Sequence, residues 1–533
     1  MVWTAPGLME PIWGREQRGR WKALRGRVGR VHARIMEALA GHPVTRRSLL
    51  AGAASVAAGW ATLGPSGATS SWAAGAVAAA SPGAADWRAL ARELSGPLLR
   101  PGDHRYAQAV RTFDPRRDGV RPRAVVQVAG HGDVVATLDF IQRFGLAVRP
   151  RSGGHSYVGA STGNGVVVLD TGGLRSIRVA SGARQVRIGA GARLGRLHEI
   201  LDERGRTIPT GTCPTVGAAG LILGGGIGAE SRLYGLACDA VVAIRVVTPD
   251  GRVRMVSRTE EPDLFWALRG SGGGNLGVVT EFVMRTFASR PAESFFLRWS
   301  PEHAVDVLRG WQERLSGMPR SSWANVHLDA AQGTVIPRIV GVAWGASGRT
   351  EAKALIRAVG VAPVRQQHVA RSHGAAMQLL AGPAGNRRQS WVAGSDIITD
   401  AMSSAEARAV VAVVRSRGRA RRSGTLILDP LDGAVHDGSI QEASFPWRRA
   451  LASLQWYVGL SSHPSRAAVA SGRDFIRAGH EAIGSASAGG YVNYLEPGRS
   501  LHQYYGRTWR RLLDTNRRYD PQGLFSSSYS LPN

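Results

Sequence analysis

The sequence has very little cysteine. Of its 533 residues only Cys213 and Cys238 are cysteines, which excludes a disulfide framework. The absence of a Cys-x-x-Cys pair also argues against a zinc site. Each of the two cysteines therefore needs an explanation of its own.

Lysine is almost absent as well, because Lys22 and Lys353 are the only two and arginine supplies the remaining positive charge. The formal net charge of +28 invites comparison with proteins that bind nucleic acid or an anionic surface. The arginines are spread along the whole chain, however, and no compact basic run with interleaved aromatics follows the first 85 residues. We therefore expect no nucleic-acid partner; a secreted basic protein that binds an anionic polymer is the alternative.

The first 85 residues have the composition of a targeting segment. Thr45–Leu50 reads Thr-Arg-Arg-Ser-Leu-Leu, a twin-arginine signature, and a moderately apolar run follows from Leu49 to Leu63. That run is too short and too rich in Ala and Gly to span a bilayer permanently, so we expect no stable membrane span; an anchoring helix is the alternative. Ala78–Ala80 suits a signal peptidase, and Met36 is a second candidate start. The sequence thus predicts export by the twin-arginine machinery to the periplasm or the cell exterior.

After residue 85, short strands and helices alternate and are joined by glycine turns. The patterns predict strands at 124–128, 166–169, 185–188 and 278–284, a hairpin over 241–257, and helices at 86–99, 132–143, 194–203 and 262–268. After about residue 289 the elements lengthen. Strands are predicted at 295–299, 323–328, 335–342, 424–428 and 454–457, and helices at 301–315, 351–359, 403–415, 466–483 and 502–518. The whole is α+β, with a second part in which a sheet is backed by helices.

Two glycine turns carry residues that can do chemistry. In Arg151–Tyr157, the amides of Ser152, Gly153 and Gly154 can form an anion nest because glycine accepts a positive φ. His155 ends this turn and would lie near whatever the bound phosphates carry; a structural histidine is the alternative. Cys213 lies in a second Gly/Pro turn, where an inert buried thiol is the alternative.

Two further glycine segments resemble nucleotide-binding loops only superficially. Gly189, Gly191 and Gly195 miss the dinucleotide fingerprint by one residue. The spacing Gly272-x-Gly274-x-x-Gly277 matches it, but a strand follows where the fingerprint needs a helix. Neither segment predicts a Rossmann site.

Several motifs occur in one order along the chain. They are Arg151–Tyr157 (RSGGHSY), Cys213–Gly217 (CPTVG), Gly224–Gly228 (GGGIG), Gly274–Thr280 (GNLGVVT), Tyr491–Tyr494 (YVNY) and the tail from Tyr504 to Phe525. This series resembles the berberine bridge enzyme-like FAD-linked oxidases of the vanillyl-alcohol oxidase superfamily, over essentially everything after residue 90. The resemblance implies a PCMH-type FAD-binding domain of two α+β subdomains plus a substrate domain with a large antiparallel sheet backed by helices. The corresponding division is a leader at 1–85, an FAD-binding domain at 86–288, a substrate domain at 289–485 and a C-terminal segment at 486–533 that returns to the FAD domain.

The resemblance also implies how the cofactor is held. His155 would bond the flavin 8α-methyl group and Cys213 the C6 position, giving a bicovalent FAD; an imidazole and a thiolate are both nucleophiles that can add to an electron-poor ring. The other cofactor-binding positions it implies are Arg151, Ser152, Gly153, Gly154, Ser156, Gly217, Gly220, Gly225, Gly228, Val279 and Asn493.

The implied catalytic residues are Tyr494, Asn493 and Tyr491, with Tyr494 as a phenolate-type base that takes a proton from a small-molecule substrate. Because a free tyrosine has a pKa near 10, we expect positive charge or hydrogen bonds to lower the pKa of Tyr494. Val216 stands where the family uses a small valine to admit O2. This favours an oxidase that acts on an alcohol, a sugar hydroxyl or a secondary metabolite and forms H2O2; a flavin dehydrogenase is the alternative.

The sequence departs from the family pattern at three positions. Leu276 stands where Phe is usual, Glu496 where Asp is frequent, and Gly394 where a basic residue is usual. The resemblance is weakest over 300–400, where the substrate is chosen. Candidate aromatic contacts for a substrate, each of which could equally belong to the core, are Trp299, Trp391, Trp456 and Tyr457. Cys238 is expected to be a small buried residue.

Overall fold

Two small sheets are built from the first half of the chain in the computed structural model, which describes residues 81–331, 333–382 and 387–532. One has the strand order β1-β2-β4-β3, with β2 and β3 both parallel to β4, and the other is antiparallel with the order β5-β6-β10-β8-β9. The strands are β1 (Leu98–Leu99), β2 (Ala124–Gln127), β3 (Val148–Arg151), β4 (Val167–Asp170), β5 (Ile177–Val179), β6 (Gln185–Gly189), β8 (Val241–Val247), β9 (Val253–Ser257) and β10 (Val278–Arg285). The twin-arginine signature and the cleavage motif lie outside the described residues.

Short helices accompany these sheets. They are α2 (Ala84–Glu93), α3 (Tyr106–Ala109), α4 (His131–Phe144), α5 (Leu194–Asp202), α6 (Ala218–Leu223), α7 (Ser231–Tyr234) and α8 (Pro262–Ala267). Helix α4 ends where the sequence predicts, because Gly145 takes a left-handed conformation with φ of 60° and caps it. The helix predicted over 86–99 is wrong at its end: α2 stops at Glu93, and Leu98–Leu99 pairs instead with β2.

The second half of the chain forms one eight-stranded antiparallel sheet with the order β15-β12-β14-β13-β17-β18-β16-β19. Its strands are β12 (Ala292–Arg298), β13 (Ser322–Ala331), β14 (Thr334–Trp344), β15 (Arg365–Arg371), β16 (Ser390–Ile398), β17 (Gly424–Pro430), β18 (Ala452–Leu460) and β19 (Ser487–Gly489). A two-stranded ribbon pairs β7 (Arg206–Thr207), which follows α5, with β11 (Phe287–Ala288), which directly precedes β12 of the large sheet in the chain.

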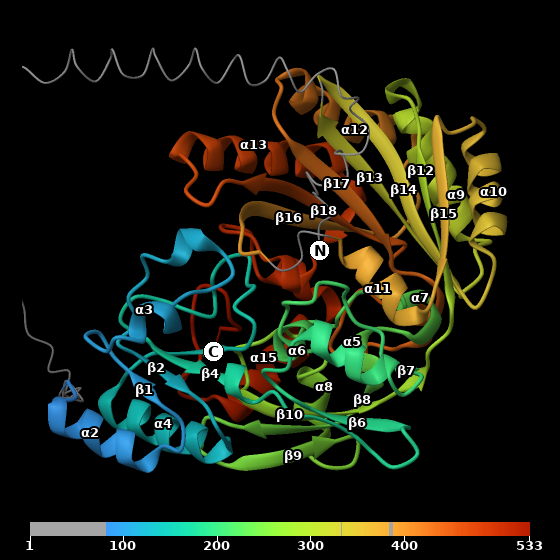
Figure 1. Ribbon diagram of the computed structural model, residues 1–533. Coiled ribbons are helices and arrows are strands. Elements are labelled where there is room, and N and C mark those ends of the chain that lie inside the picture. Colours follow the sequence, from blue (N-terminus) through green and yellow to red (C-terminus); the bar gives the residue numbers. More distant parts are fainter. Residues whose placement is uncertain (1–80, 332, 383–386, 533) are drawn as a thin grey trace, which may run out of the picture. The chain divides into compact units, whose positions relative to one another are not determined.

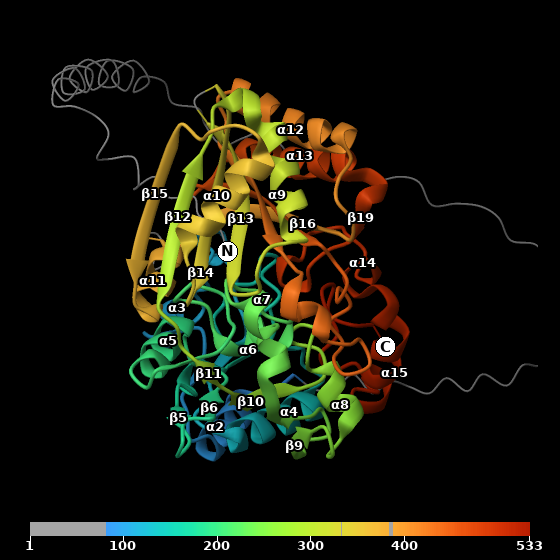
Figure 2. The same cartoon turned by 90° about the vertical axis from the view of Figure 1, so that its right-hand side faces the viewer.

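Four helices cover one face of the large sheet (Figures 1 and 2). They are α9 (Ala304–Leu315), α10 (Gly348–Val359), α12 (Ser404–Arg419) and α13 (Arg466–Ile483), and their apolar sides share one core with the strands. The other face of the sheet is turned toward the two small sheets (Figure 1), where α11 (His373–Ala381) also lies. The fold is therefore α+β with a large antiparallel sheet backed by helices, as the resemblance implies.

The chain then crosses back to the first half. Helical turn η9 (Val492–Tyr494) leads to α14 (His502–Tyr505) and α15 (Trp509–Tyr519), which packs near α8. The single helix predicted over 502–518 is thus divided at Gly506, whose φ of 44° interrupts it. Within the part of the chain that the structure describes, none of the helices combines the length and apolarity needed to cross a bilayer.

Candidate active site

A cavity of about 1530 Å³, including solvent at its mouth, opens between these layers. Five stretches that are distant in sequence supply most of its wall: 149–157, 211–223, 271–279, 491–495 and 527–530. The predicted site residues that line it are Arg151, Ser152, Gly153, Gly154, His155, Ser156, Cys213, Gly217, Gly220, Val279, Tyr491, Asn493 and Tyr494. Gly225 and Gly228 are not among the lining residues: a side chain at Gly225 would meet the Phe445 ring, and one at Gly228 would meet the Thr210 carbonyl.

His155 reaches the cavity at the end of its turn and stacks on Phe113, with ring centroids 3.8 Å apart and planes 23° from parallel. Both ring nitrogens are buried, and neither makes a hydrogen bond of standard geometry to a described residue. Burial, helped by the positive charge of Arg193 and opposed by a contact with the Thr215 backbone, lowers the pKa of His155 to about 3. The imidazole is therefore neutral at pH 7, with a lone pair available for reaction, and a buried histidine with two such nitrogens calls for a further group.

Cys213 is nearly buried and lies in the same cavity. Burial raises the pKa of its thiol, and the contact of its Sγ with Thr215 Oγ1 at 3.8 Å opposes that rise only in part. The side chain is thus a thiol here and not the thiolate that the sequence argument assumed. Cys238 is fully buried outside the cavity wall and its pKa is raised to about 12, mainly by burial, as suits a small core residue.

The two turns that carry His155 and Cys213 touch each other directly. Any side chain at Gly153 would meet the Gly217 backbone nitrogen, and one at Gly217 would meet Ser152 Oγ. Arg193 reinforces the contact by donating from Nη1 to the Thr215 carbonyl at 2.8 Å. Only Gly154 of the predicted nest has a positive φ, of 70°. Gly153 is required for close packing and not for its conformation.

This contact gives a first prediction. Gly153→Ala should lower stability by about 1–3 kcal/mol, because the added methyl group would overlap the Gly217 backbone nitrogen and must push the two backbones apart. Thermal unfolding would measure the loss. The matched control is Gly132→Ala, since Gly132 lies in α4 with open space around its Cα; it should unfold at or slightly above the wild-type temperature. Equal melting temperatures for the two variants would contradict the packing argument.

Arg151 and Ser152 line the cavity, and their polar ends are engaged by other parts of the chain. Arg151 donates from Nη2 to Asp170 at 2.9 Å and to the Ala109 carbonyl at 2.5 Å, which ties the start of the turn to the end of β4. Ser152 Oγ donates to the Ala190 carbonyl at 2.7 Å. Both side chains therefore fix the turn in place.

Tyr491 and Asn493 form one hydrogen-bonded unit in the wall. The Tyr491 hydroxyl accepts from the Gly226 amide at 3.1 Å and from Asn493 Nδ2 at 2.8 Å, and Asn493 Nδ2 also donates to the Leu221 carbonyl at 3.1 Å. Burial raises the pKa of Tyr491 to about 12 against these hydrogen bonds. The unit attaches the C-terminal part of the chain to the end of α6, and Tyr491 stays protonated.

Tyr494 lies between two aromatic rings. Tyr157 stacks on it with centroids 5.1 Å apart and planes 9° from parallel, and Tyr491 meets it edge-on at 4.9 Å. Burial raises the pKa of Tyr494 well above 10, and Tyr157 and the carboxylate of Asp429 raise it further. The expected lowering of the Tyr494 pKa is therefore wrong for the protein alone, because burial and the neighbouring phenols, acid and thiol all raise it.

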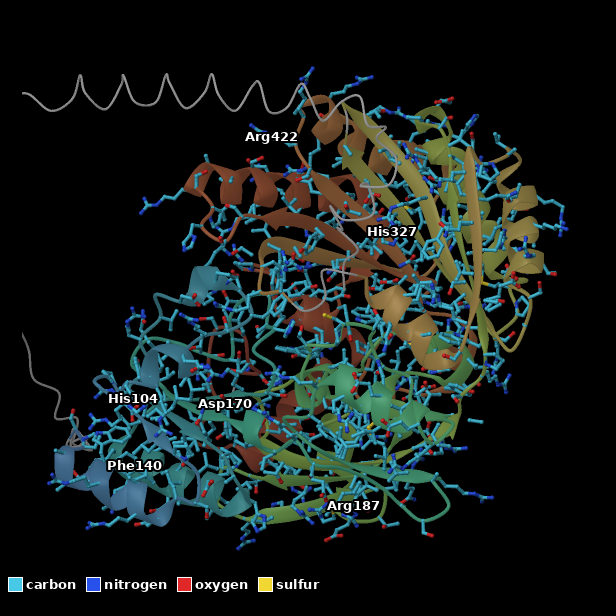
Figure 3. All side chains as sticks on the ribbon, viewed as in Figure 1. His104, Phe140, Asp170, Arg187, His327 and Arg422 are labelled. Carbon is cyan, nitrogen blue, oxygen red and sulfur yellow. The ribbon has the colours of Figure 1, made fainter. Side chains whose placement is uncertain are left out.

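The face of the large sheet that meets Tyr157 is partly aromatic. Trp391 and Tyr457 pack there with Tyr157, whose hydroxyl accepts from Gln455 Nε2 at 2.5 Å. Figure 3 labels a residue in each of the two layers between which the cavity opens: Asp170 at the end of β4 in the small parallel sheet, and His327 in β13 of the large sheet. Trp299 and Trp456, the other two candidate aromatics, are buried in the core on the helix-covered side.

Sequence reasoning missed part of the wall. Ser271–Asn275, Tyr505, Ser527, Tyr529 and Ser530 line the cavity, and Tyr505 donates its hydroxyl to the Ser271 carbonyl at 2.8 Å. The spacing Gly272-x-Gly274-x-x-Gly277 was the available signal. These glycines have φ values of 81°, 84° and 143° and border the cavity although a strand follows them.

The residues present fit an FAD. The cavity joins a glycine-bordered end, where backbone can approach phosphates, to an aromatic end beside Tyr494. The space next to Gly220 is open, with no atom within 4 Å of where a side chain would begin. The two buried nitrogens of His155 supply the reactive group that such a ligand would meet.

Comparison with known proteins agrees with this chemistry. A family model described as an FAD binding domain matches residues 122–257. The uncharacterized FAD-linked oxidoreductase YgaK of Bacillus subtilis is 26% identical over 455 residues, covering 83% of this chain and 97% of its own. The chitooligosaccharide oxidase of Gibberella zeae is 28% identical over 445 residues, covering 79% and 87%.

Among solved structures, the glucooligosaccharide oxidase of Acremonium strictum, titled for its 6-S-cysteinyl, 8α-N1-histidyl FAD, superimposes with a TM-score of 0.76 at 22% identity, covering 84% of this chain and 99% of its own. The fold predicted from the resemblance is thereby confirmed. The class of protein follows from the matched domain: it binds FAD. The chain is an FAD-linked oxidoreductase, with berberine bridge enzyme-like proteins and carbohydrate oxidases among its relatives.

Proposed function

We propose that this chain is an oxidase that carries FAD bonded to both His155 and Cys213 and that oxidises a sugar or other alcohol, with O2 reduced to H2O2. The observation that carries the proposal is that one cavity holds both residues, with both nitrogens of His155 buried and making no hydrogen bond of standard geometry to a described residue. A neutral imidazole is the form that can bond a carbon atom, and burial keeps it neutral.

When bound, the flavin would supply the acceptor for a hydride. The chain's own task is then to orient the alcohol and to take its hydroxyl proton. We assign that proton to the phenol oxygen of Tyr494, and we assign Asn493 and Tyr491 the task of holding the segment in place. Because Tyr494 is protonated in the protein alone, ligand binding must lower its pKa before it can act as a base.

The proposed substrate class rests on the aromatic and amide side chains that line the cavity. Tyr157, Tyr491 and Tyr494 line the cavity and offer flat apolar surfaces, and the Asn493 amide lies beside them. Trp391 and Tyr457 are buried and pack behind Tyr157. Rings flanked by hydrogen-bonding groups suit a sugar, whose faces are apolar and whose edges carry hydroxyls. The name of the Gibberella zeae relative, chitooligosaccharide oxidase, points the same way.

The test is a peroxide-coupled screen of oligosaccharides, simple alcohols and phenols with the purified protein. Yellow colour that stays with the denatured polypeptide would support covalent flavin and would exclude a protein that merely binds an anionic polymer. Reduced flavin that re-oxidises slowly in air but quickly with a quinone would replace the oxidase by the dehydrogenase alternative.

Oxygen access gives a second prediction. Val216 lines the cavity and is 6% exposed, so Val216→Leu should slow re-oxidation of the reduced flavin by O2 while leaving its reduction by substrate near the wild-type rate. Stopped-flow absorbance measures the two half-reactions separately. Val216→Ala is the control, because a smaller side chain should leave re-oxidation at least as fast; slowing in both variants would contradict a steric role.

We further propose that the protein is exported already folded by the twin-arginine machinery, on the strength of the motif at 45–50. A covalently held cofactor would suit that route, because it cannot dissociate during transport. Replacing Arg46 and Arg47 by Lys and locating the protein by cell fractionation tests the proposal.

A further inference from the structure

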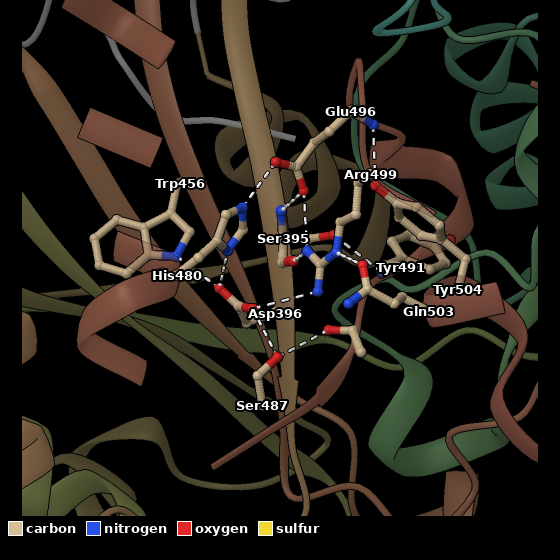
Figure 4. A network of polar contacts seen from close by, with 12 residues as sticks. Ser395, Asp396, Trp456, His480, Ser487, Tyr491, Glu496, Arg499, Gln503 and Tyr504 are labelled. Carbon is tan, nitrogen blue, oxygen red and sulfur yellow. Dashed lines mark hydrogen bonds and ion pairs between the residues drawn. The ribbon is translucent and has the colours of Figure 1, made fainter. Parts of the chain in front are cut away.

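A buried ionic cluster lies beside Tyr491, which begins the segment that also carries Asn493 and Tyr494 (Figure 4). It consists of Asp396 in β16, His480 in α13, and Glu496 and Arg499 in the segment that follows η9. Asp396 is 1% exposed and Glu496 8% exposed. Two carboxylates this deeply buried require cations and hydrogen bonds around them.

His480 joins the two carboxylates. Its Nδ1 is 2.7 Å from Asp396 Oδ2 and its Nε2 is 2.8 Å from Glu496 Oε2 (Figure 4). An ionised carboxylate only accepts hydrogen bonds, so both contacts are satisfied at once only when both ring nitrogens carry a proton. With Arg499 and an imidazolium opposing the two acids, the cluster is electrically neutral.

The place of Glu496 depends on a missing side chain. A Cβ at Gly394 would overlap the Glu496 carboxylate, so the glycine leaves the space that this acid occupies. Glu496 Oε1 there accepts from the Ser395 amide at 3.1 Å and from Arg499 Nη1 at 3.0 Å. Gly394 and Glu496 are two of the positions at which the sequence departs from the family pattern, and the structure joins them. Because β16 has glycine and no basic residue at position 394, the cation between β16 and Glu496 is supplied by His480 of α13.

The cluster is connected to the cavity wall by short covalent and hydrogen-bonded paths. Ser395 Oγ accepts from the Tyr491 amide at 3.0 Å. Glu496 follows Tyr494 by two residues, and its amide donates to the Tyr504 hydroxyl at 3.0 Å. A shift of the Glu496 carboxylate would therefore move the segment that carries all three proposed catalytic residues.

We propose that His480 is a positioning residue whose imidazolium bridges Asp396 and Glu496 and thereby holds Tyr491–Tyr494 at the cavity. The catalytic part of this inference rests on the proposed function; the bridge itself does not. The proposal makes the geometry of the site depend on the protonation of a residue that does not line the cavity.

The charged and titratable groups around His480 are few. Asp396 faces it from β16, and Glu496, Arg499 and Tyr504 lie on the tail side. On α13 itself, Glu481 and Arg477 form an exposed pair. Strand β18 contributes only the Trp456 indole, which donates to Asp396, while Arg417 and Arg422 of the α12 side contact α13 at Ser471, away from His480. Burial lowers the pKa of His480, but the hydrogen bonds that its ring donates to Asp396 and Glu496, together with their negative charges, outweigh burial and raise the pKa to about 9.

The sign of the pH effect follows from that value. A histidine with an unfolded pKa near 6.5 and a folded pKa of about 9 stabilises the fold fully below pH 6.5, and the stabilisation is lost as the pH rises through 9. The melting temperature of the wild type should therefore exceed that of His480→Gln most at pH 6, and the difference should shrink by pH 10. This readout needs no catalytic activity.

The experiment compares the full-length wild type, His480→Gln, Glu496→Gln and the control His436→Gln at pH 6, 7, 9 and 10, in both thermal unfolding and steady-state turnover. His436 is also in the second half of the chain, but its Nε2 meets the Ala450 carbonyl and no carboxylate bridge. We expect His480→Gln and Glu496→Gln to lower kcat at least about tenfold at pH 7, since small misplacements of catalytic groups are costly. The deficit of His480→Gln should narrow at pH 10.

Two results would overturn the proposal: wild-type kcat in His480→Gln at pH 7, or a deficit in kcat and melting temperature that is the same at pH 6 and pH 10. The second would mean that the histidine only fills space. Absence of oxidase activity from the wild type would contradict the proposed function, while the melting temperatures would still decide whether the bridge exists.

Discussion

Tyr494→Phe should lower kcat by about 10²–10⁴-fold, the range typical for loss of a general base. The change removes only the phenol oxygen, so the stacking on Tyr157 and the edge contact with Tyr491 should survive. Flavin content and melting temperature should therefore match those of the wild type. Single-turnover reduction of the flavin by substrate is the appropriate measurement, because it isolates the step in which the hydroxyl proton leaves.

The matched control is Tyr234→Phe. Its hydroxyl donates to the Ala288 carbonyl at 2.9 Å, and Tyr234 does not line the cavity. Full turnover by this variant, together with a large loss in Tyr494→Phe, would assign the loss to the phenol in the cavity. If Tyr494→Phe reduced its flavin at the wild-type rate, another group would have to be the base, and Asp429 would be the first to test.

The second large effect is expected from replacing His155 and Cys213, the two residues proposed to bond the flavin. His155→Ala and Cys213→Ala should each leave FAD attached through one bond, and the double variant should have no covalent flavin. The reason is that the two residues are the only histidine and cysteine lining the cavity within the described residues. Intact mass after denaturation reads the result directly, as the mass of one FAD retained in the wild type and each single variant and lost in the double variant.

Cys238→Ala is the control for the cysteine, because Cys238 is buried away from the cavity wall. It should keep its flavin fully attached. The single variants should also turn over more slowly than the wild type, since each loses one constraint on the position of the cofactor. Retention of flavin by the denatured double variant would contradict the assignment of both bonds.

The sequence predicts best the parts whose signal is local. Gly145 after a helical pattern and the Pro249-Asp250-Gly251 turn in the hairpin each specify their own structure. It does not predict β15, because Arg365–Arg371 is an exposed edge strand of mostly polar residues. It also misses β16, whose run of small residues has no clear period although all of it is buried.

In the site, too, local motifs were predicted from the sequence and long-range contacts were not. The ordered motifs identify His155, Cys213 and Tyr494, and the fold brings them to one cavity. The direction of the Tyr494 and Cys213 pKa shifts was not accessible, because burial sets it and burial depends on strands more than 100 residues away, such as the one that carries Trp391. The contact of Gly153 with Gly217 was not accessible for the same reason.

The part of the cavity wall formed by the C-terminal residues determines when, during translation, the cavity can close. Tyr529 and Ser530 line the cavity, and the Leu531 amide donates to Asn275 Oδ1 at 2.9 Å. While these residues are still inside the ribosome, the nascent chain already contains His155 and Cys213, but the cavity around them is not yet closed. A site closed by these residues therefore forms only after translation has reached Leu531.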